Sequence, residues 1–168
     1  GLSHIIRNLR MAEVSSMQYI DGNNVAQAWP PPDATTLARG ITFRRPVDLD
    51  NDGNPFSGDS LAVDWSGVVT IRLDSEDING DLRTDQVVQL FNNTFDKILI
   101  NDIAAPNRNT DGTAYDTSSV GGFWLRCPNP AEPLDRNLIH ISMVQERALG
   151  TVPGTVVNFY EDFVRARN

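Results

Sequence analysis

The sequence predicts an α+β domain in which an N-terminal amphipathic helix packs on antiparallel β-sheet. Two observations lead to this fold class. Apolar residues recur at helical spacing near the start of the chain, and the segments after residue 41 are short, rich in β-branched and aromatic residues and bounded by turn formers. Helix followed by runs of strand is typical of the α+β class. We therefore expect a single domain over residues 1–168, with a β-rich region from 41 to 168.

The helix is predicted from Ser3 to Tyr19, ending before the turn-forming residues 21–24. Its pattern begins at once, without a capping residue, which indicates that the sequence starts inside a longer helix. The apolar positions that define its buried face recur three and four residues apart: Leu2, Ile5, Ile6, Leu9 and Ala12.

The Trp29–Pro32 segment contains three consecutive prolines, so we expect an extended connector there. Strands are then predicted to alternate with turns, and the Asn92-Asn93 pair is predicted to join two of them. A polar surface loop is expected over 104–119. The predicted strands are 41–45, 61–65, 68–73, 86–91, 97–100, 122–126, 138–144 and 155–160.

Composition narrows the function classes. The chain has 168 residues with 14 basic and 22 acidic side chains, a net charge of −8, which opposes binding to nucleic acid or to anionic membrane surfaces. Its single cysteine, Cys127, rules out an intramolecular disulfide and is expected to be a small buried residue. No apolar run approaches the roughly 20 residues that cross a bilayer.

Two acidic loops carry oxygen side chains at alternate positions, as loops that wrap a calcium ion do. The second loop has the pattern Asp-x-Asn-Gly-Asp-x-x-x-Asp and is the stronger of the two motifs. The first has Asp rather than Glu at its last position, where a longer side chain reaches the ion more readily. The predicted ligands are Asp77, Asn79, Asp81, Asp85 and the backbone carbonyl of Arg83 in the second loop, and Asp48, Asp50, Asp52, Asn54 and Asp59 in the first.

An alternative for both loops is an Asp/Asn-rich turn whose side chains bond their own backbone. Repulsion between neighbouring carboxylates favours a bound cation instead, because two unit charges ~4 Å apart repel by about 4 kcal/mol at an effective dielectric of 20. We therefore expect calcium at one loop, with a second ion at the other as a further possibility.

No catalytic constellation accompanies these loops. The sequence lacks zinc-binding histidine pairs, a nucleophile elbow and a phosphate-binding glycine-rich loop, so we do not expect an enzyme. His140 lies in a predicted strand and is interpreted as a structural histidine. Trp65 and Trp124 are interpreted as core residues, with a sugar-binding surface as the alternative.

Several short segments together resemble one family. The helix carrying Leu9-Arg10-Met11-Ala12, the loop 77–81, the segment 97–103, the strand 138–144 and the ending 163–168 are similar to the soluble part of type IV pilin-like proteins. Among these the chain most resembles minor pilins of the PilW kind and the J-type minor pseudopilins of type II secretion.

This resemblance implies a non-catalytic minor subunit that initiates or caps assembly of a type IV pilus or a secretion pseudopilus. Residues 1–20 would be the lower half of a filament-core helix, and other minor pilins or pseudopilins would be the partners. The implied location is the bacterial cell envelope, in a periplasmic or extracellular filament anchored in the inner membrane before assembly. The alternatives are a calcium-dependent adhesion or carbohydrate-binding module and a metal-dependent hydrolase.

Overall fold

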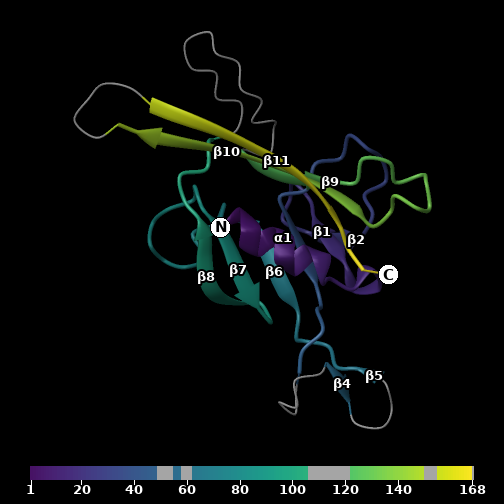
Figure 1. The fold of residues 1–168 in the computed structure, drawn as a ribbon. Coiled ribbons are helices and arrows are strands. Elements are labelled where there is room, and N and C mark those ends of the chain that lie inside the picture. The colour runs from purple at the N-terminus through teal and green to yellow at the C-terminus, as the bar shows by residue number, and fades with distance from the viewer. Residues whose placement is uncertain (49–54, 58–61, 106–121, 150–154, 168) are drawn as a thin grey trace.

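The computed structural model describes residues 1–48, 55–57, 62–105, 122–149 and 155–167, and it is rich in β-structure (Figure 1). The described chain opens with the nine-residue helix α1 (Leu2–Arg10) and the 3-10 turn η1 (Val14–Ser16). Eleven strands follow in the described residues: β1 (Gln18–Ile20), β2 (Ala26–Ala28), β3 (Gly40–Phe43), β4 (Phe56–Ser57), β5 (Ala62–Val63), β6 (Val69–Leu73), β7 (Val87–Phe91), β8 (Thr94–Ile100), β9 (Phe123–Arg126), β10 (Leu138–Ala148) and β11 (Thr155–Arg165).

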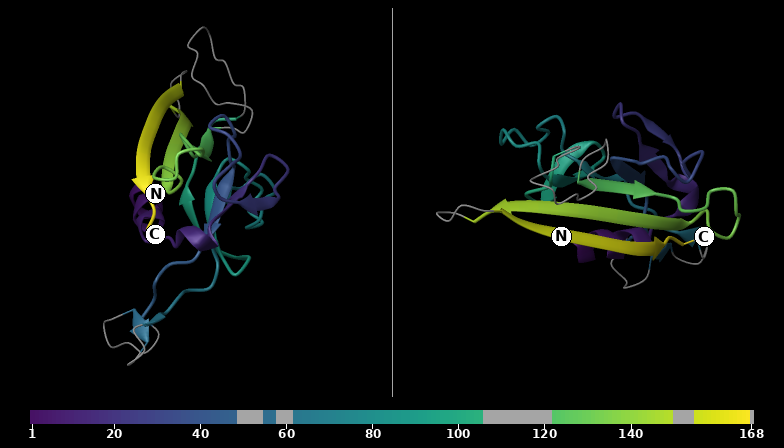
Figure 2. Two further views of the ribbon diagram at one scale, coloured as in Figure 1. Left: turned by 90° about the vertical axis from the view of Figure 1, so that its right-hand side faces the viewer. Right: turned by 90° about the horizontal axis from the view of Figure 1, so that it is seen from above.

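Two antiparallel sheets form two layers. The first has six strands in the order β2-β1-β3-β6-β7-β8, and the second has three in the order β11-β10-β9. Figure 2 shows the layers facing each other, with α1 beside the C-terminal end of β11. The β4–β5 ribbon lies away from both sheets (Figures 1 and 2).

Backbone bridges join the two sheets at two places along the β9 edge of the three-stranded sheet. At one place the Ala38 N–H donates to the Leu125 carbonyl at 2.8 Å, and the Leu125 N–H donates back at 3.0 Å. At the other, Ile103 pairs with Gln145 of β10, and the Ala104 N–H donates to the Val144 carbonyl at 2.9 Å. These bridges hold the inner faces of the sheets in register with each other.

The helix α1 closes the remaining open side of this core. Ile5, Leu9 and Ala12 are fully buried, and they belong to one cluster with Ile71 of the first sheet and Ile141 of the second. The side chains of both sheets therefore pack against the same face of the helix.

The α+β fold-class prediction is wrong, because the protein is mostly strand and its one described α-helix is short. The predicted helix ran to Tyr19, but α1 ends at Arg10. Beyond it the backbone finds partners outside the helix: the Glu13 N–H donates to the Arg44 carbonyl at 2.9 Å and the Val14 N–H to the Arg167 carbonyl at 3.2 Å. Tertiary backbone pairing therefore replaces the helical hydrogen bonds.

The segment that follows joins the first sheet as β1. Met17 and Tyr19 are buried while Gln18 is exposed, which is the two-residue period of a strand. The other predicted strands are found, with β8, β10 and β11 longer than expected, and of the described residues 62–65 only Ala62–Val63 form a strand. The turn at Asn92 and Asn93 is confirmed, since both have the positive φ of a two-residue hairpin turn, 49° and 62°. Cys127 is fully buried as predicted, and burial raises the pKa of its thiol.

If α1 closes the core, replacing Leu9 by Ala will lower the free energy of unfolding by about 2–5 kcal/mol, because it leaves a cavity between the sheets. The matched control is Leu134→Ala, whose side chain is exposed and whose loss is expected to cost less than about 0.5 kcal/mol. Urea unfolding followed by circular dichroism measures both. Equal losses in the two variants would contradict this position of the helix.

Candidate functional site

The second acidic loop connects β6 to β7, and all of its residues are described. Asp77, Gly80 and Leu82 have φ values of 51°, 73° and 66°, the left-handed region that lets a chain turn sharply. Asp74, just before the loop, is fully buried, and its carboxylate accepts the Ile78 N–H at 2.9 and 3.1 Å. The loop is therefore anchored at its start by a buried carboxylate.

The predicted ligands Asp77, Asn79 and Asp81 each accept a hydrogen bond from a backbone N–H of the same loop. The donors are the N–H groups of Leu82 at 3.0 Å, of Asp81 at 3.3 Å and of Arg83 at 2.9 Å, respectively. This is the arrangement of a turn closed by its own Asp and Asn side chains. It preorganises the loop and uses one oxygen of each side chain.

Gln86, which the sequence reasoning missed, organises the interior of the loop. Its side chain is 1% exposed. Its amide nitrogen donates to Asp81 Oδ2 at 2.9 Å and to Asn101 Oδ1 at 3.0 Å, and its amide oxygen accepts from Asn79 Nδ2 at 3.1 Å. The sequence did contain a signal for this role, because Gln86 lies between the acidic loop and the apolar residues of the next strand.

The side chain of Arg83 has a role that the sequence reasoning did not predict, whereas the prediction for its backbone carbonyl stays a prediction. Its side chain forms two hydrogen bonds to Asp85, at 2.9 and 2.8 Å, and a third to Asp102 at 2.8 Å. The hydrogen bonds from Arg83 hold the pKa of Asp85 below its ordinary value, although burial acts in the opposite direction. The same pairing raises the pKa of the Arg83 guanidinium.

The pKa of Asp81 is also lowered. Partial loss of hydration acts to raise it, but hydrogen bonds from Gln86, from the Arg83 N–H and from Asn79 together outweigh that effect. Asp81 and Asp85 are therefore both held as carboxylates in the folded protein, with Asp85 directed at a guanidinium.

No group of three or more His, Cys, Asp and Glu side chains within the described residues is arranged to hold a metal ion. Asp77, Asn79 and Asp81 share one short loop, whereas Asp85 is paired with Arg83. Of the predicted ligands in the first loop only Asp48 is described, and it has a polar or electrostatic partner. The other predicted ligands of that loop lie outside the described residues: Asp50, Asp52, Asn54 and Asp59.

A second cluster lies on the outer face of the three-stranded sheet. The His140 ring stacks on Phe163 with centroids 4.3 Å apart, and Trp124 meets His140 edge-on at 5.1 Å. Arg126 donates from Nε to His140 Nδ1 at 3.0 Å, and its guanidinium carbon lies 5.4 Å from the Trp124 ring centroid. Nδ1 of His140 therefore has a hydrogen-bond partner, as expected of a structural histidine.

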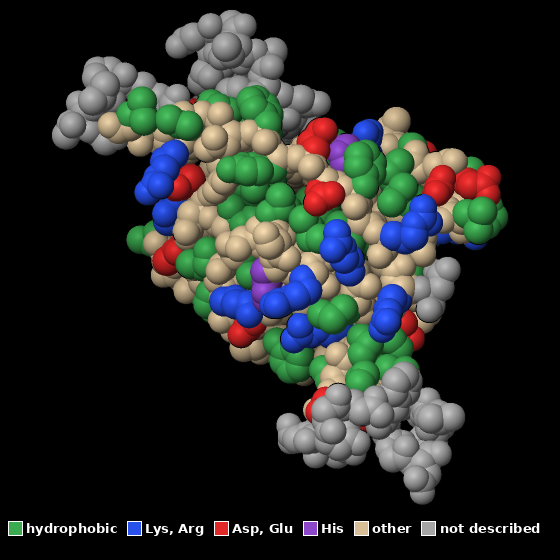
Figure 3. Space-filling model, viewed as in Figure 1, with side chains coloured by type: hydrophobic (Ala, Val, Ile, Leu, Met, Phe, Trp, Pro, Cys, Tyr) green, Lys and Arg blue, Asp and Glu red, His purple; other side chains and the backbone are tan. Residues whose placement is uncertain are grey.

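A basic surface lies over α1. Arg7 and Arg10 are exposed, and no ion pair to either occurs among the described residues. Backbone or side-chain hydrogen bonds place three more arginines against residues 8–14: Arg44, Arg45 and Arg167. Figure 3 shows Lys and Arg side chains gathered across the middle of this face.

Comparison with models of known families, with curated proteins and with solved structures gives no match for this chain. In the described part of the chain, no helix has the length and apolar character required to cross a membrane.

Because the folded-state pKa of Asp85 is lowered, the folded protein binds fewer protons than the unfolded chain. The stabilisation from the Arg83 pair is therefore complete above the unfolded pKa near 3.8 and is lost as the pH falls through the lower folded value. We expect Asp85→Asn to lower the melting temperature at neutral pH, and the gap to wild type to close in acid. Melting curves across this pH range, with the exposed Glu132→Gln as control, measure the gap; a gap independent of pH would contradict the pairing.

Proposed function

We propose that the chain is a non-catalytic subunit of a bacterial surface filament, of the minor pilin or pseudopilin kind, and that α1 is its main assembly surface. The observation that carries the proposal is the two-sided character of α1. One side is buried in the core through Ile5 and Leu9, and the other presents Arg7 and Arg10 to solvent. Leu2 and Ile6 are only partly buried along the same helix.

Charge supports an assembly role for this surface. The arginines around α1 lie on a chain whose net charge is −8, so most of the remaining surface of a second subunit is complementary to them. Contact between two different patches on neighbouring subunits is a heterologous interface, and repetition of such an interface builds a helical filament. A subunit of this kind needs no catalytic groups.

We propose that calcium orders the loop 77–85 in the same subunit. Asp77, Asn79 and Asp81 would supply side-chain oxygens, and the carbonyl of Arg83 a further one. Their hydrogen bonds to loop N–H groups leave the second carboxylate oxygen of Asp77 for a cation. Asp85 would bind only by leaving Arg83, so the Arg83 pair and calcium compete for this carboxylate.

The filament proposal is tested with charge reversal on α1. We expect the chain to be found in filaments sheared from cells that express it, and the Arg7→Glu/Arg10→Glu variant to be depleted from that fraction at least severalfold, because its contact surface repels acidic neighbours. The matched control is Lys97→Glu/Arg136→Glu, which changes the net charge equally at exposed positions outside α1. Immunoblotting measures incorporation, and melting curves verify folding. Equal incorporation of both variants would refute the assembly role of α1.

For calcium, we expect the melting temperature to rise with millimolar calcium and to fall on chelation, since a ligand bound only by the folded state stabilises it by about 2.7 kcal/mol at a hundredfold excess over Kd. Asp81→Ala will remove more of this rise than Asp59→Ala. Scanning fluorimetry with magnesium as the control measures the effect. An unchanged melting temperature would show that neither loop binds calcium.

A further inference from the structure

Two buried N–H donors on the outer face of the three-stranded sheet lack an acceptor. Trp124 and His140 are 7% and 3% exposed. Trp124 Nε1 and His140 Nε2 are both buried atoms without a hydrogen-bond partner among the described residues. A donor in this position normally has a partner, because its desolvation is otherwise uncompensated.

The tautomer of His140 follows from Arg126. Since Arg126 Nε–H donates to His140 Nδ1 at 3.0 Å, Nδ1 is an acceptor and the proton of the neutral ring lies on Nε2. Burial first, and then the charge of Arg126, lower the pKa of His140, while Glu161 acts to raise it. The nearest carboxylate oxygen, Glu161 Oε1, is 3.8 Å from Nε2, too far for a direct hydrogen bond.

A hollow opens beside Trp124, whose ring packs against His140. Its volume is about 350 Å³, at the small end of the range for ligand pockets. Trp124 lines it together with Glu161, whose side chain is 64% exposed, and the rim includes the exposed ring of Phe159. The exposed ring of Phe163, which stacks on His140, continues the aromatic surface. The remaining lining residues are Ser142, Val144 and Tyr160.

The groups at this hollow select the chemistry of a ligand. The Trp124 indole N–H needs an acceptor, the Glu161 carboxylate needs donors, and aromatic faces pack against apolar C–H surface. An anion would be repelled by Glu161, a cation would meet an N–H donor, and an apolar ligand would leave the donor unsatisfied. A hydroxyl group both accepts and donates, so adjacent hydroxyls on a partly apolar ring meet all three requirements.

We propose that Trp124, His140 and Glu161 form a binding site for a neutral carbohydrate, sized for one sugar unit at the outer face of β9–β11. Trp124 Nε1 donates to a sugar hydroxyl, Glu161 accepts from one, and Phe159 contacts the ring edge. His140 packs edge-on against Trp124 and positions its ring. The site uses none of the acidic-loop residues and does not require calcium. It is independent of filament assembly.

The test is a titration of the ¹⁵N-labelled chain with methyl glycosides of glucose, galactose, mannose and N-acetylglucosamine at millimolar concentrations. The chain has three tryptophans, and the Trp124 indole signal is identified by its absence from Trp124→Phe. We expect this signal to shift saturably with at least one sugar. No shift with any of the sugars, or a shift produced only by inorganic phosphate, would overturn the proposal.

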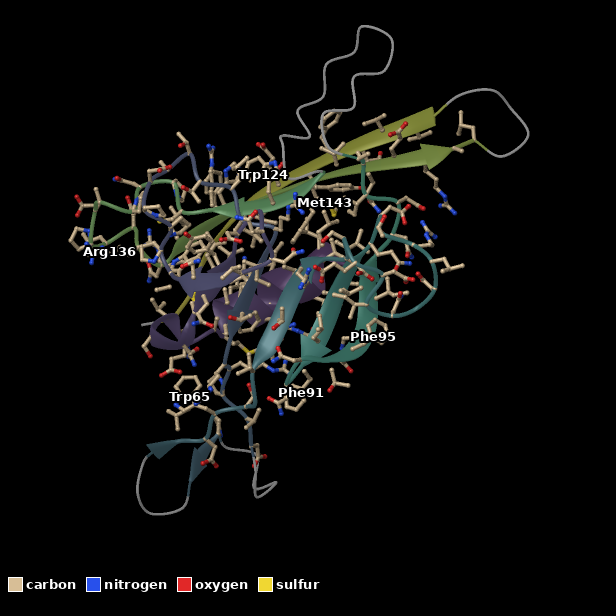
Figure 4. The ribbon with its side chains drawn as sticks, turned by 180° about the vertical axis from the view of Figure 1, so that it is seen from behind. Trp65, Phe91, Phe95, Trp124, Arg136 and Met143 are labelled. Carbon is tan, nitrogen blue, oxygen red and sulfur yellow. The ribbon has the colours of Figure 1, made fainter. Side chains whose placement is uncertain are left out.

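Variants distinguish a specific site from nonspecific binding of sugars to exposed aromatic rings. Trp124→Phe and Glu161→Gln are each expected to weaken binding roughly three- to tenfold, the effect of one lost hydrogen bond. Trp65→Phe is the matched control, because Trp65 lies at the opposite end of the molecule from Trp124 (Figure 4), and it is expected to leave Kd unchanged. Equal weakening by Trp65→Phe would overturn the site. Glu161 is exposed, so Glu161→Gln decides the question if Trp124→Phe does not fold.

Discussion

The backbone bridges between the two sheets are the constraint on which the rest of the structure depends. Ala38 pairs with Leu125 and Ile103 with Gln145 along the β9 edge of the three-stranded sheet, so the two inner faces are held together by main-chain hydrogen bonds as well as by apolar contact. With this edge joined, the open side of the core next to β11 accepts a single amphipathic helix. The second bridge also fixes the acidic loop, because the Ile103 N–H donates to the Asp85 carbonyl at 2.8 Å.

The sequence predicted most strands because their apolar residues are local and periodic. It did not predict how far they extend. β10 and β11 continue through Gln145–Arg147 and Glu161–Asp162, polar residues that are partly or fully exposed and whose backbones pair across the strands. The predicted helix was too long for the opposite reason. Val14–Tyr19 has enough apolar residues to fit a helical pattern, but its backbone pairs with residues far away in the chain. No local pattern encodes such partners.

The candidate site was predictable to the same degree. The loop positions of Asp77, Asn79 and Asp81 were readable from spacing, because a turn closed by its own side chains is a local structure. The contacts of the Arg83 side chain could not be predicted from spacing, since its second partner, Asp102, comes from beyond β8. Trp124, His140 and Phe163 also come from three separate strands, and only the register of β10 with its two neighbours brings them together.

The outer-face cluster carries an energetic cost that packing alone does not explain. Leaving a buried donor without an acceptor costs about 1–3 kcal/mol, in proteins whose total stability is about 5–15 kcal/mol. Two donors of the cluster have no acceptor among the residues that the structure describes. Phe or Leu at the position of Trp124 would fill comparable volume without that cost. Arg126 also fixes the tautomer of His140, because its hydrogen bond to Nδ1 leaves the ring proton on Nε2. The buried Trp124 N–H, held beside this ring, is prepared for an acceptor, and the hollow that Trp124 and Glu161 line is where a ligand can bring one.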